Sequence, residues 1–312
     1  MNATRSLQVH FVLSRKFFDR YWADLDQLLA RKATPDEMPE RFIAGRDVWV
    51  IQTLLELNAR YSRDGELSYG FSSRWGALNL LHCDDFGSRS ACWKGDAIVV
   101  RADRPPVRGA DWVVIQSSVT PQDGPHRYIP HWPQPGLIPH PSREEPAGPW
   151  RAVYFGRTGA FPEAFRSARL VEEARRRGIE IEFREREWWN YRDVDVAISF
   201  REMPHEQLLA KPPSKLVNAW IAGVPMVCDG EPSFAALRES CLDYLQAATP
   251  EELLSHLEWL RSDFTLRRAM VAQGRRRAEA FSRDAVLAAW VDFLENLPRK
   301  SGALRRLLGR LF

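Results

Sequence analysis

Proline is distributed very unevenly in this 312-residue chain. Nine of the 21 prolines lie between Pro121 and Pro149. Because proline fixes φ and has no backbone N–H to donate, this stretch is not expected to form a helix or a central strand. Each flanking half is about the size of one domain. We therefore predict an N-terminal domain, a proline-rich linker, a C-terminal domain and a short tail, at residues 1–120, 121–149, 150–298 and 299–312.

Short apolar runs alternate with amphipathic stretches on both sides of the linker. The first half is predicted to contain strands at 7–14, 48–52, 67–73, 97–103 and 111–118, with helices at 17–32 and 53–62. The second half is predicted to contain strands at 151–156, 179–185, 194–200 and 224–229, with helices at 163–178 and 213–223 and three closing helices from 250 to 297. This alternation predicts βαβ units, and hence two α/β domains with largely parallel sheets.

Composition excludes several classes of protein. With 44 basic and 41 acidic residues the net charge is only +3, which does not favour nucleic acid as a partner. The four cysteines show no C-x-x-C spacing, so neither a zinc site nor a disulfide framework is expected. No apolar run approaches the roughly 18 residues that a membrane span needs, and the N-terminus lacks the apolar core of a signal peptide. We expect a protein of the reducing cytoplasm.

Polar residues follow four predicted elements of the second half. They occur in the loop Gly156–Gly159, which contains Arg157, in Ser199–Arg201, in Lys211–Lys215 and in Asp229–Glu231. In open α/β sheets, ligands bind outside the carboxyl ends of the strands. These segments are therefore the candidate binding site.

The segment KPPSK has the features of an anion site. Pro213 and Ser214 are expected to begin a helix, with Ser214 as its N-cap, and Lys211 and Lys215 lie on either side of them. A helix N-terminus offers free N–H groups and a partial positive charge, which suit a diphosphate. The alternative is that Ser214 only caps the helix and that the lysines are solvated. Arg157, between two glycines, favours the anion site.

The segment KPPSKLVNAWIAGVPMV resembles the donor-site segment of GT-B glycosyltransferases, in which a helix ending A-x-x-x-G-x-P follows the nucleotide-binding loop. The resemblance covers roughly residues 150–290. It implies two facing Rossmann-like domains with a donor cleft between them and a nucleotide-sugar held mainly by the second. Transferred by position, Asn218 stands where many relatives have a glutamate on the donor ribose.

The chain also departs from the family pattern. A second glutamate common in retaining enzymes would lie eight residues before Asn218, where this chain has Ala210. The stereochemistry of transfer therefore stays open. The letters D-x-D occur at Asp193–Asp195, but Val194 opens a buried run, so a structural role is expected there. GT-B relatives usually replace a metal with basic side chains and helix dipoles, so we expect metal-independent catalysis without a cofactor.

The first half is expected to supply the acceptor site and any general base. His82, Asp84 and Asp85 follow a predicted strand, and such a mixture of side chains can deprotonate a sugar hydroxyl. Ser14–Lys16, after the first strand, are a candidate for facing the donor phosphates. The linker histidines His126, His131 and His140 have no recognised metal spacing.

The tail at 299–312 places five apolar side chains opposite arginines on a helical pattern. This is typical of a short helix on a membrane surface, although packing against the protein explains it equally well. We expect a bacterial glycosyltransferase of polysaccharide biosynthesis that moves a sugar from a nucleotide-diphosphate sugar to a glycan or lipid-linked acceptor. It would be cytoplasmic, with peripheral contact to the inner face of the membrane through the tail. The alternatives are a nucleotide-sugar epimerase of the same fold and a non-catalytic nucleotide- or glycan-binding module.

Overall fold

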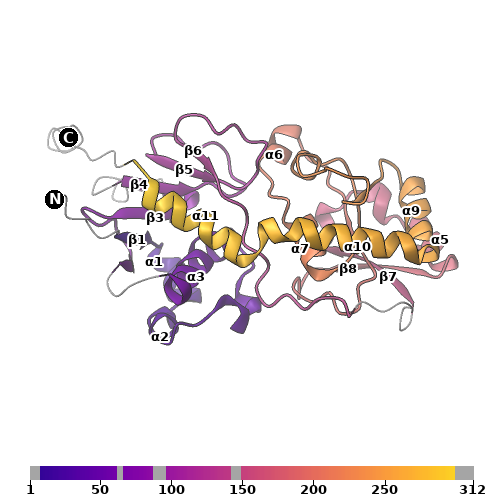
Figure 1. Ribbon diagram of the computed structural model, residues 1–312, viewed down its shortest axis with the longest axis horizontal. Coiled ribbons are helices and arrows are strands. Elements are labelled where there is room, and N and C mark those ends of the chain that lie inside the picture. The colour runs from indigo at the N-terminus through magenta and orange to yellow at the C-terminus, as the bar shows by residue number, and fades with distance from the viewer. Residues whose placement is uncertain (1–7, 62–65, 87–95, 142–148, 299–312) are drawn as a thin grey trace. The chain divides into compact units, whose positions relative to one another are not determined.

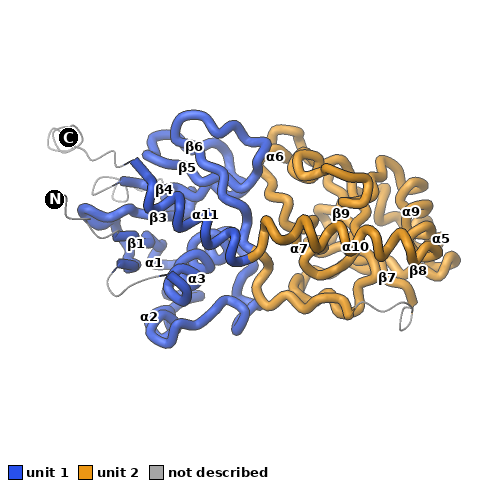
Figure 2. The backbone as a smooth tube through the Cα atoms, viewed as in Figure 1, with its two compact units in different colours: residues 1–132, 283–312 blue, residues 133–282 orange. Residues whose placement is uncertain are grey.

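In the computed structural model the chain forms two compact units, each built on its own parallel sheet (Figure 1). Unit 1 comprises residues 1–132 and 283–312, and unit 2 comprises residues 133–282 (Figure 2). The structure describes residues 8–61, 66–86, 96–141 and 149–298. The predicted α/β class is confirmed, since all pairings between the named strands are parallel.

The sheet of unit 1 has six strands in the order β2-β1-β3-β4-β5-β6. Their bounds are β1 Val9–Val12, β2 Leu67–Gly70, β3 Leu78–His82, β4 Asp96–Val100, β5 Trp112–Ile115 and β6 His126–Tyr128. Every residue of β1, β3, β4 and β5 is buried, as expected for strands of a parallel sheet covered on both faces. The predicted linker thus contributes a strand, but only at the edge of the sheet, where proline-rich sequence is tolerated.

Short helices accompany this sheet. They are α1 Arg15–Tyr21, α2 Leu25–Ala30, α3 Gln52–Arg60 and α4 Cys83–Phe86, with 3-10 turns at Pro35–Glu37 and Pro39–Arg41. The predicted strand at 48–52 is wrong, because a π-helical turn at Asp47–Ile51 leads directly into α3. Trp49, Val50 and Ile51 are buried. A helix buried on all sides gives the same continuous apolar run as a buried strand.

The last helix, α11 (Arg283–Asn296), packs in unit 1. Its residues Val286, Trp290 and Leu294 belong to the hydrophobic core of that unit, together with strand residues such as Phe11. The domain boundaries therefore differ from those predicted: the chain leaves unit 1 after Trp132 and returns at Arg283. The apolar spacing of α11 predicts an amphipathic helix, but it does not say which sheet the helix covers.

The sheet of unit 2 has five strands in the order β11-β10-β9-β7-β8. Their bounds are β7 Trp150–Phe155, β8 Ile179–Arg184, β9 Val196–Ser199, β10 Met226–Cys228 and β11 Leu245–Gln246. The α-helices are α5 Ala168–Arg176, α6 His205–Leu209, α7 Ser214–Ala222, α8 Pro232–Ala235, α9 Pro250–Ser262 and α10 Phe264–Ala278, and 3-10 turns lie at Thr158–Ala160, Glu163–Arg166 and Glu279–Phe281. As predicted, α7 ends at a glycine: Gly223 has φ +70°, a conformation that glycine adopts without strain.

Two residues that follow β6 are buried in unit 1. Ile129 and Trp132 are 2% and 1% exposed, and the Trp132 indole donates a hydrogen bond to Thr53 Oγ1 over 2.9 Å. These contacts explain why unit 1 extends through residue 132. Among the described residues, no helix combines the length and the apolar character that crossing a membrane requires.

Candidate functional site

Three neighbouring strands of unit 2 deliver polar residues to one edge of the sheet. β10, β9 and β7 are adjacent and parallel, so the segments that follow them share the carboxyl edge. These segments begin at Gly156, Phe200 and Asp229. The start of α7 lies at the same edge, because Lys215 on its first turn contacts Tyr154 of β7. The four segments predicted from the sequence are therefore brought together.

Lys215 is held against an aromatic ring. Its Nζ lies 3.9 Å from the centroid of the Tyr154 ring, and Tyr154 is itself buried. The Lys215 side chain is partly exposed; its partial burial and the nearby Arg201 guanidinium lower its pKa, while Glu231 and Asp229 act in the opposite direction. Within the described chain, this ammonium forms no ion pair with a carboxylate. Tyr154 was not singled out by sequence analysis, since a tyrosine in a buried strand has the pattern of an ordinary core residue.

Arg201 is the second cation of the site and is bound by acids. Its Nη1 donates to Glu231 Oε1 over 2.9 Å, and its backbone N donates to Asp229 Oδ2 over 2.7 Å. Glu231 Oε1 also accepts a bond from Ser233 Oγ at 3.1 Å. Burial raises the pKa of Glu231 and that of Asp229. The second oxygen of Glu231 and the hydroxyl of Ser199 are buried without a hydrogen-bond partner among the described residues.

The loop after β7 depends on a glycine. Gly156 has φ +149°, and a Cβ at this position would lie only 2.9 Å from the Tyr154 hydroxyl. Arg157 follows and is exposed. The backbone N of Thr158 donates to Glu185 Oε1 over 2.7 Å, and this bond, assisted by the Arg157 charge, lowers the pKa of Glu185. The loop therefore passes close to Tyr154 at Gly156 and presents an exposed arginine at the next position.

The amino end of α7 has no side-chain cap. The N-cap residue is Pro213, and Ser214 is the first helical residue, so the prediction that Ser214 caps the helix is wrong. The backbone oxygen of Pro213 accepts a hydrogen bond from Val217 N over 3.0 Å. The proline side chain has no acceptor, so it cannot cap the N–H groups of the first turn. Lys211 lies just before this end, partly exposed. The helix start thus keeps its positive end for an anion.

Asn218 is placed one turn further along α7. It is 8% exposed, and its Oδ1 accepts a hydrogen bond from the backbone N of Gln134 over 3.2 Å. This bond ties the helix to the segment that enters unit 2. Because the side-chain oxygen accepts this bond, the amide nitrogen of Asn218 is the group that would bind a ribose hydroxyl. The assignment of Asn218 to the ribose stays a prediction.

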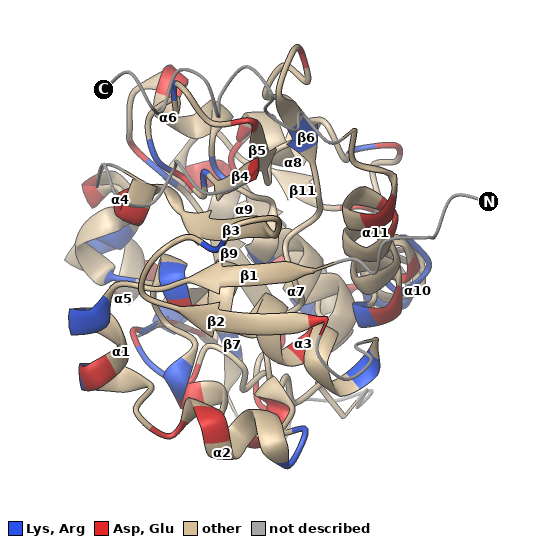
Figure 3. Cartoon of the chain, turned by 90° about the vertical axis from the view of Figure 1, so that its left-hand side faces the viewer, with Lys and Arg blue, Asp and Glu red and all other residues tan. Residues whose placement is uncertain are grey.

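The candidate base residues of unit 1 lie at the end of β3 and in α4, where acidic residues are coloured in Figure 3. Asp85 accepts two 2.9 Å bonds from Arg46, and Asp84 accepts bonds of 3.1 and 3.0 Å from Arg104. His82 is 2% exposed, accepts from Asp84 N over 3.1 Å and has a pKa lowered by burial. These contacts give all three residues a structural role, and a role as general base stays a prediction.

Two groups of potential metal ligands have other partners. Ligand atoms of His82, Cys83 and Asp84 lie within 4.8 Å of one another. The Cys83 thiol, however, donates to Arg101 O at 3.1 Å, and burial raises its pKa to about 12. In the D-x-D stretch, Asp195 Oδ2 accepts from Arg151 N over 2.8 Å and Asp193 pairs with Arg184. These contacts agree with the structural role predicted for that stretch, and the absence of a metal there stays a prediction.

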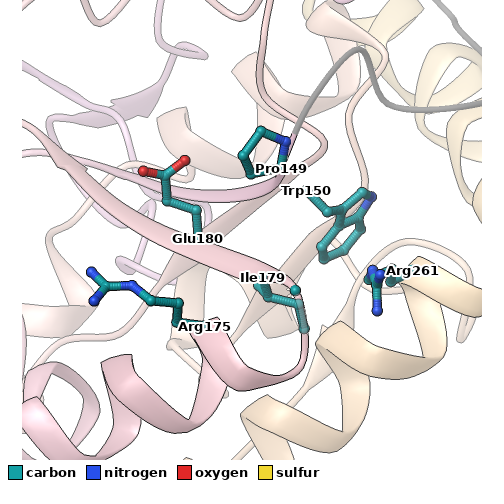
Figure 4. Close-up of a pocket in the computed structure, with 7 residues that line it drawn as sticks. Pro149, Trp150, Arg175, Ile179, Glu180 and Arg261 are labelled. Atoms are coloured by element: carbon teal, nitrogen blue, oxygen red, sulfur yellow. The ribbon is translucent and has the colours of Figure 1, made fainter.

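A cavity of about 520 Å³ lies elsewhere in unit 2 (Figure 4). Trp150 and Ile179, which line it, are the first residues of β7 and β8, so the cavity is at the amino edge of the sheet. Arg175 and Arg261 complete its rim from α5 and α9. It therefore lies at the opposite edge from the predicted binding residues and shares none of them.

Comparison with known proteins gives matches in structure only. No family model matches the chain, and no curated protein matches its sequence. AviGT4, a glycosyltransferase involved in avilamycin A biosynthesis, matches with a TM-score of 0.55 and 14% identity over 93% of this chain and 98% of that one. Anabaena Alr3699/HepE, solved in complex with UDP, matches with a TM-score of 0.52 and 12% identity over 93% and 100%. The chain has the GT-B fold.

Among GT-B structures, TarM also matches, with a TM-score of 0.50 and 11% identity. That match covers 70% of this chain and 55% of TarM, so this chain spans about half the length of TarM. The GT-B fold predicted from the donor-site segment is confirmed. Within it, the donor-binding residues predicted in the second half of the chain all belong to unit 2, whereas the further candidates Ser14–Lys16 belong to unit 1.

Proposed function

We propose that this protein is a glycosyltransferase that moves a sugar from a nucleotide-diphosphate sugar to a glycan or lipid-linked acceptor. The observation that carries the proposal is the cationic cluster at the carboxyl edge of unit 2, where Lys215 lies beside the uncapped start of α7. Two GT-B neighbours support it, since HepE was solved with UDP-glucose and AviGT4 is a glycosyltransferase. An unbalanced positive charge at a sheet edge suits a diphosphate.

In the proposed reaction the diphosphate is the leaving group, and its developing negative charge is what most needs stabilisation. Lys211, Lys215 and Arg157 would neutralise it, and the N–H groups of Ser214 and its neighbours would donate to it. The side chain of Asn218 would hold the ribose. Catalysis would not require a metal, because these cations and the helix dipole take its place.

Other residues of the same edge would bind the rest of the donor. The Gly156 backbone would approach the phosphates closely, and Pro213 would set the start of the helix. Ser199 and Arg201 would border the base, where the buried Ser199 hydroxyl can accept or donate a bond. Unit 1 would bind the acceptor, with His82, Asp84 and Asp85 near it.

We also propose a cytoplasmic location with peripheral membrane contact through the tail, which lies outside the described residues. Each basic residue near an anionic surface contributes about 1 kcal/mol, and the contribution falls with salt. Full-length protein should sediment with anionic liposomes at low salt, and a chain ending at Pro298 should do so much less. Equal sedimentation of the two would remove the support for a lipid-linked acceptor.

The proposal is tested by a thermal-shift screen against UDP, GDP, CDP, dTDP and their sugars. A ligand at 100 times its dissociation constant should stabilise the protein by about 2.7 kcal/mol. The nucleotide-sugar that binds is then incubated with and without candidate acceptors. Transfer that depends on the acceptor supports a glycosyltransferase, and product formed without acceptor indicates an epimerase. If no nucleotide shifts the melting temperature, the proposed donor site is wrong.

A further inference from the structure

The ammonium of Lys215 is held by a ring and not by an acid. Its Nζ lies 3.9 Å from the centroid of the Tyr154 ring, and within the described residues it pairs with no carboxylate. The lysine side chain is partly exposed, and its four-carbon stem is flexible when nothing holds its end. The contact with Tyr154 therefore restricts where the charge lies.

Tyr154 is itself firmly packed. It is 2% exposed on β7, and its ring centroid lies 4.6 Å from that of Phe161 and 6.2 Å from that of Phe183. A Cβ at Gly156 would lie 2.9 Å from the Tyr154 hydroxyl, so the glycine lets the loop after β7 pass this close to the ring. The ring is thus a rigid support that contacts both the first turn of α7 and the loop after β7.

A ring differs from a carboxylate as a partner for an amine. The negative face of the ring attracts the ammonium but carries no net charge, so the positive charge stays available to a ligand. The neighbouring acids have other partners: Glu231 pairs with Arg201 at 2.9 Å, and Asp229 accepts the backbone N–H groups of Arg201 and Glu231 at 2.7 and 3.3 Å. Of these two cations, Lys215 is the one without an ion pair within the described residues.

We propose that Tyr154 is a positioning residue of the diphosphate site, whose ring holds the Lys215 ammonium where the phosphates bind. The inference rests on the proposed function and deepens it, because it gives a core residue of β7 a role in binding that it exerts through Lys215. A charge that is already held in place loses less side-chain freedom when its partner binds. Removing the ring should therefore weaken binding of charged ligands, and should do so only while Lys215 is present.

The experiment is calorimetric titration of the full chain with UDP, with GDP and with the matching nucleosides. Tyr154→Leu should weaken diphosphate binding by about tenfold, the size of a partly desolvated contact between a cation and a ring, and leave nucleoside binding unchanged. Tyr154→Phe should bind like the unchanged protein, because it keeps the ring, and the hydroxyl that it removes forms no hydrogen bond within the described residues. Phe165→Leu is the matched control. Phe165 stacks on Phe200 in the same core, so this variant should lower stability without changing the affinity.

A double variant separates positioning from a general effect on the fold. In a chain that carries Lys215→Ala, Tyr154→Leu should cause no further loss of diphosphate affinity, because the ring then has no ammonium to hold. Additive losses from the two substitutions would overturn the inference. A loss with Tyr154→Phe as large as that with Tyr154→Leu would also overturn it, because the ring would then not be the group that matters.

If Tyr154→Leu does not fold, Tyr154→Phe variants that carry fluorine atoms on the ring decide. Fluorine nearly preserves the shape of the ring but withdraws negative charge from its face, which weakens its attraction for a cation. Diphosphate affinity should then fall with each added fluorine, and the same affinity for every ring would overturn the inference.

The outcomes also separate this inference from the proposed function. Diphosphate binding that Tyr154→Leu leaves unchanged would overturn the role of Tyr154 alone. If neither a diphosphate nor any nucleotide-sugar binds to the unchanged protein, the proposed function fails, and the role of Tyr154 fails with it.

Discussion

The carboxyl edges of the two sheets have similar architecture but differ in how their charges are paired. In unit 1 the acids that follow β3 are each bound by an arginine of the same unit, Asp84 by Arg104 and Asp85 by Arg46. In unit 2 Glu231 pairs with Arg201, Asp229 accepts backbone N–H groups, and Lys215 lies against a ring. A sheet edge alone therefore does not identify a ligand site. Charge that the protein does not compensate is the more informative feature.

The largest expected effect is a loss of free energy of unfolding when an ion pair is broken. We compare one ion pair from each edge. The Arg201–Glu231 pair has side chains 13% and 0% exposed, whereas the Arg104–Asp84 pair is 53% and 31% exposed. Glu231→Ala should lower the free energy of unfolding by about 3 kcal/mol, because it leaves a nearly buried guanidinium uncompensated. Asp84→Ala should lower it by less than about 1 kcal/mol. Urea unfolding measures both, and equal losses would contradict the contrast.

A second effect concerns a buried acid of unit 1 away from the edge. Glu56 in α3 is fully buried, and its Oε1 lies 3.0 Å from Arg283 Nε without forming a hydrogen bond. Burial raises the pKa of Glu56 to about 7. Between about pH 4.5 and 7 the folded protein should hold one more proton at Glu56 than the unfolded chain. Stability should thus fall as pH rises, by up to about 1.4 kcal/mol per pH unit. Glu56→Gln should remove this slope, and a pH profile unchanged by the substitution would refute the assignment.

Much of the fold is predictable because it is local. The strands after the linker and the glycine that ends α7 follow from apolar runs and from φ preferences. The strand predicted at 48–52 is wrong because this helical segment is buried, and a buried helix lacks the apolar–polar alternation every 3.6 residues that identifies a helix in the sequence. The return of α11 to unit 1 depends on which core its apolar face meets, and this is a tertiary property.

The candidate site divides in the same way. Lys211 and Lys215 are predictable from a helix start with cations on both sides. The contact of Lys215 with Tyr154, and the capture of Glu231 by Arg201, join residues more than 25 positions apart. Nothing in the sequence gives those pairs, so the charge imbalance that favours a diphosphate is visible only in the folded chain.

A third, smaller effect compares two exposed arginines. Arg157→Ala should weaken binding of the nucleoside diphosphate by about tenfold, equivalent to about 1.4 kcal/mol, because the side chain is solvated beside the proposed phosphates. Arg104→Ala, which removes the partner of Asp84, should leave this affinity unchanged. Titration calorimetry of both variants checks the prediction. If Arg104→Ala weakens binding of the nucleoside diphosphate and Arg157→Ala does not, the diphosphate binds at the edge in unit 1 and the assignment to unit 2 is wrong.

The smallest expected effect is none. Turnover should continue in EDTA, since Lys211, Lys215, Arg157 and the start of α7 are proposed to neutralise the leaving diphosphate. Initial rates with and without chelator measure this. Loss of activity that is restored by Mn²⁺ or Mg²⁺ would show that the cations of unit 2 are insufficient.

The central claim is that the uncompensated charge of unit 2 binds phosphate, and calorimetry of Lys215→Ala with two ligands tests it most directly. The nucleoside diphosphate and the matching nucleoside share the base and ribose but differ in charge. The account predicts that Lys215→Ala weakens binding of the diphosphate strongly and leaves that of the nucleoside nearly unchanged. Equal losses for both ligands would contradict it.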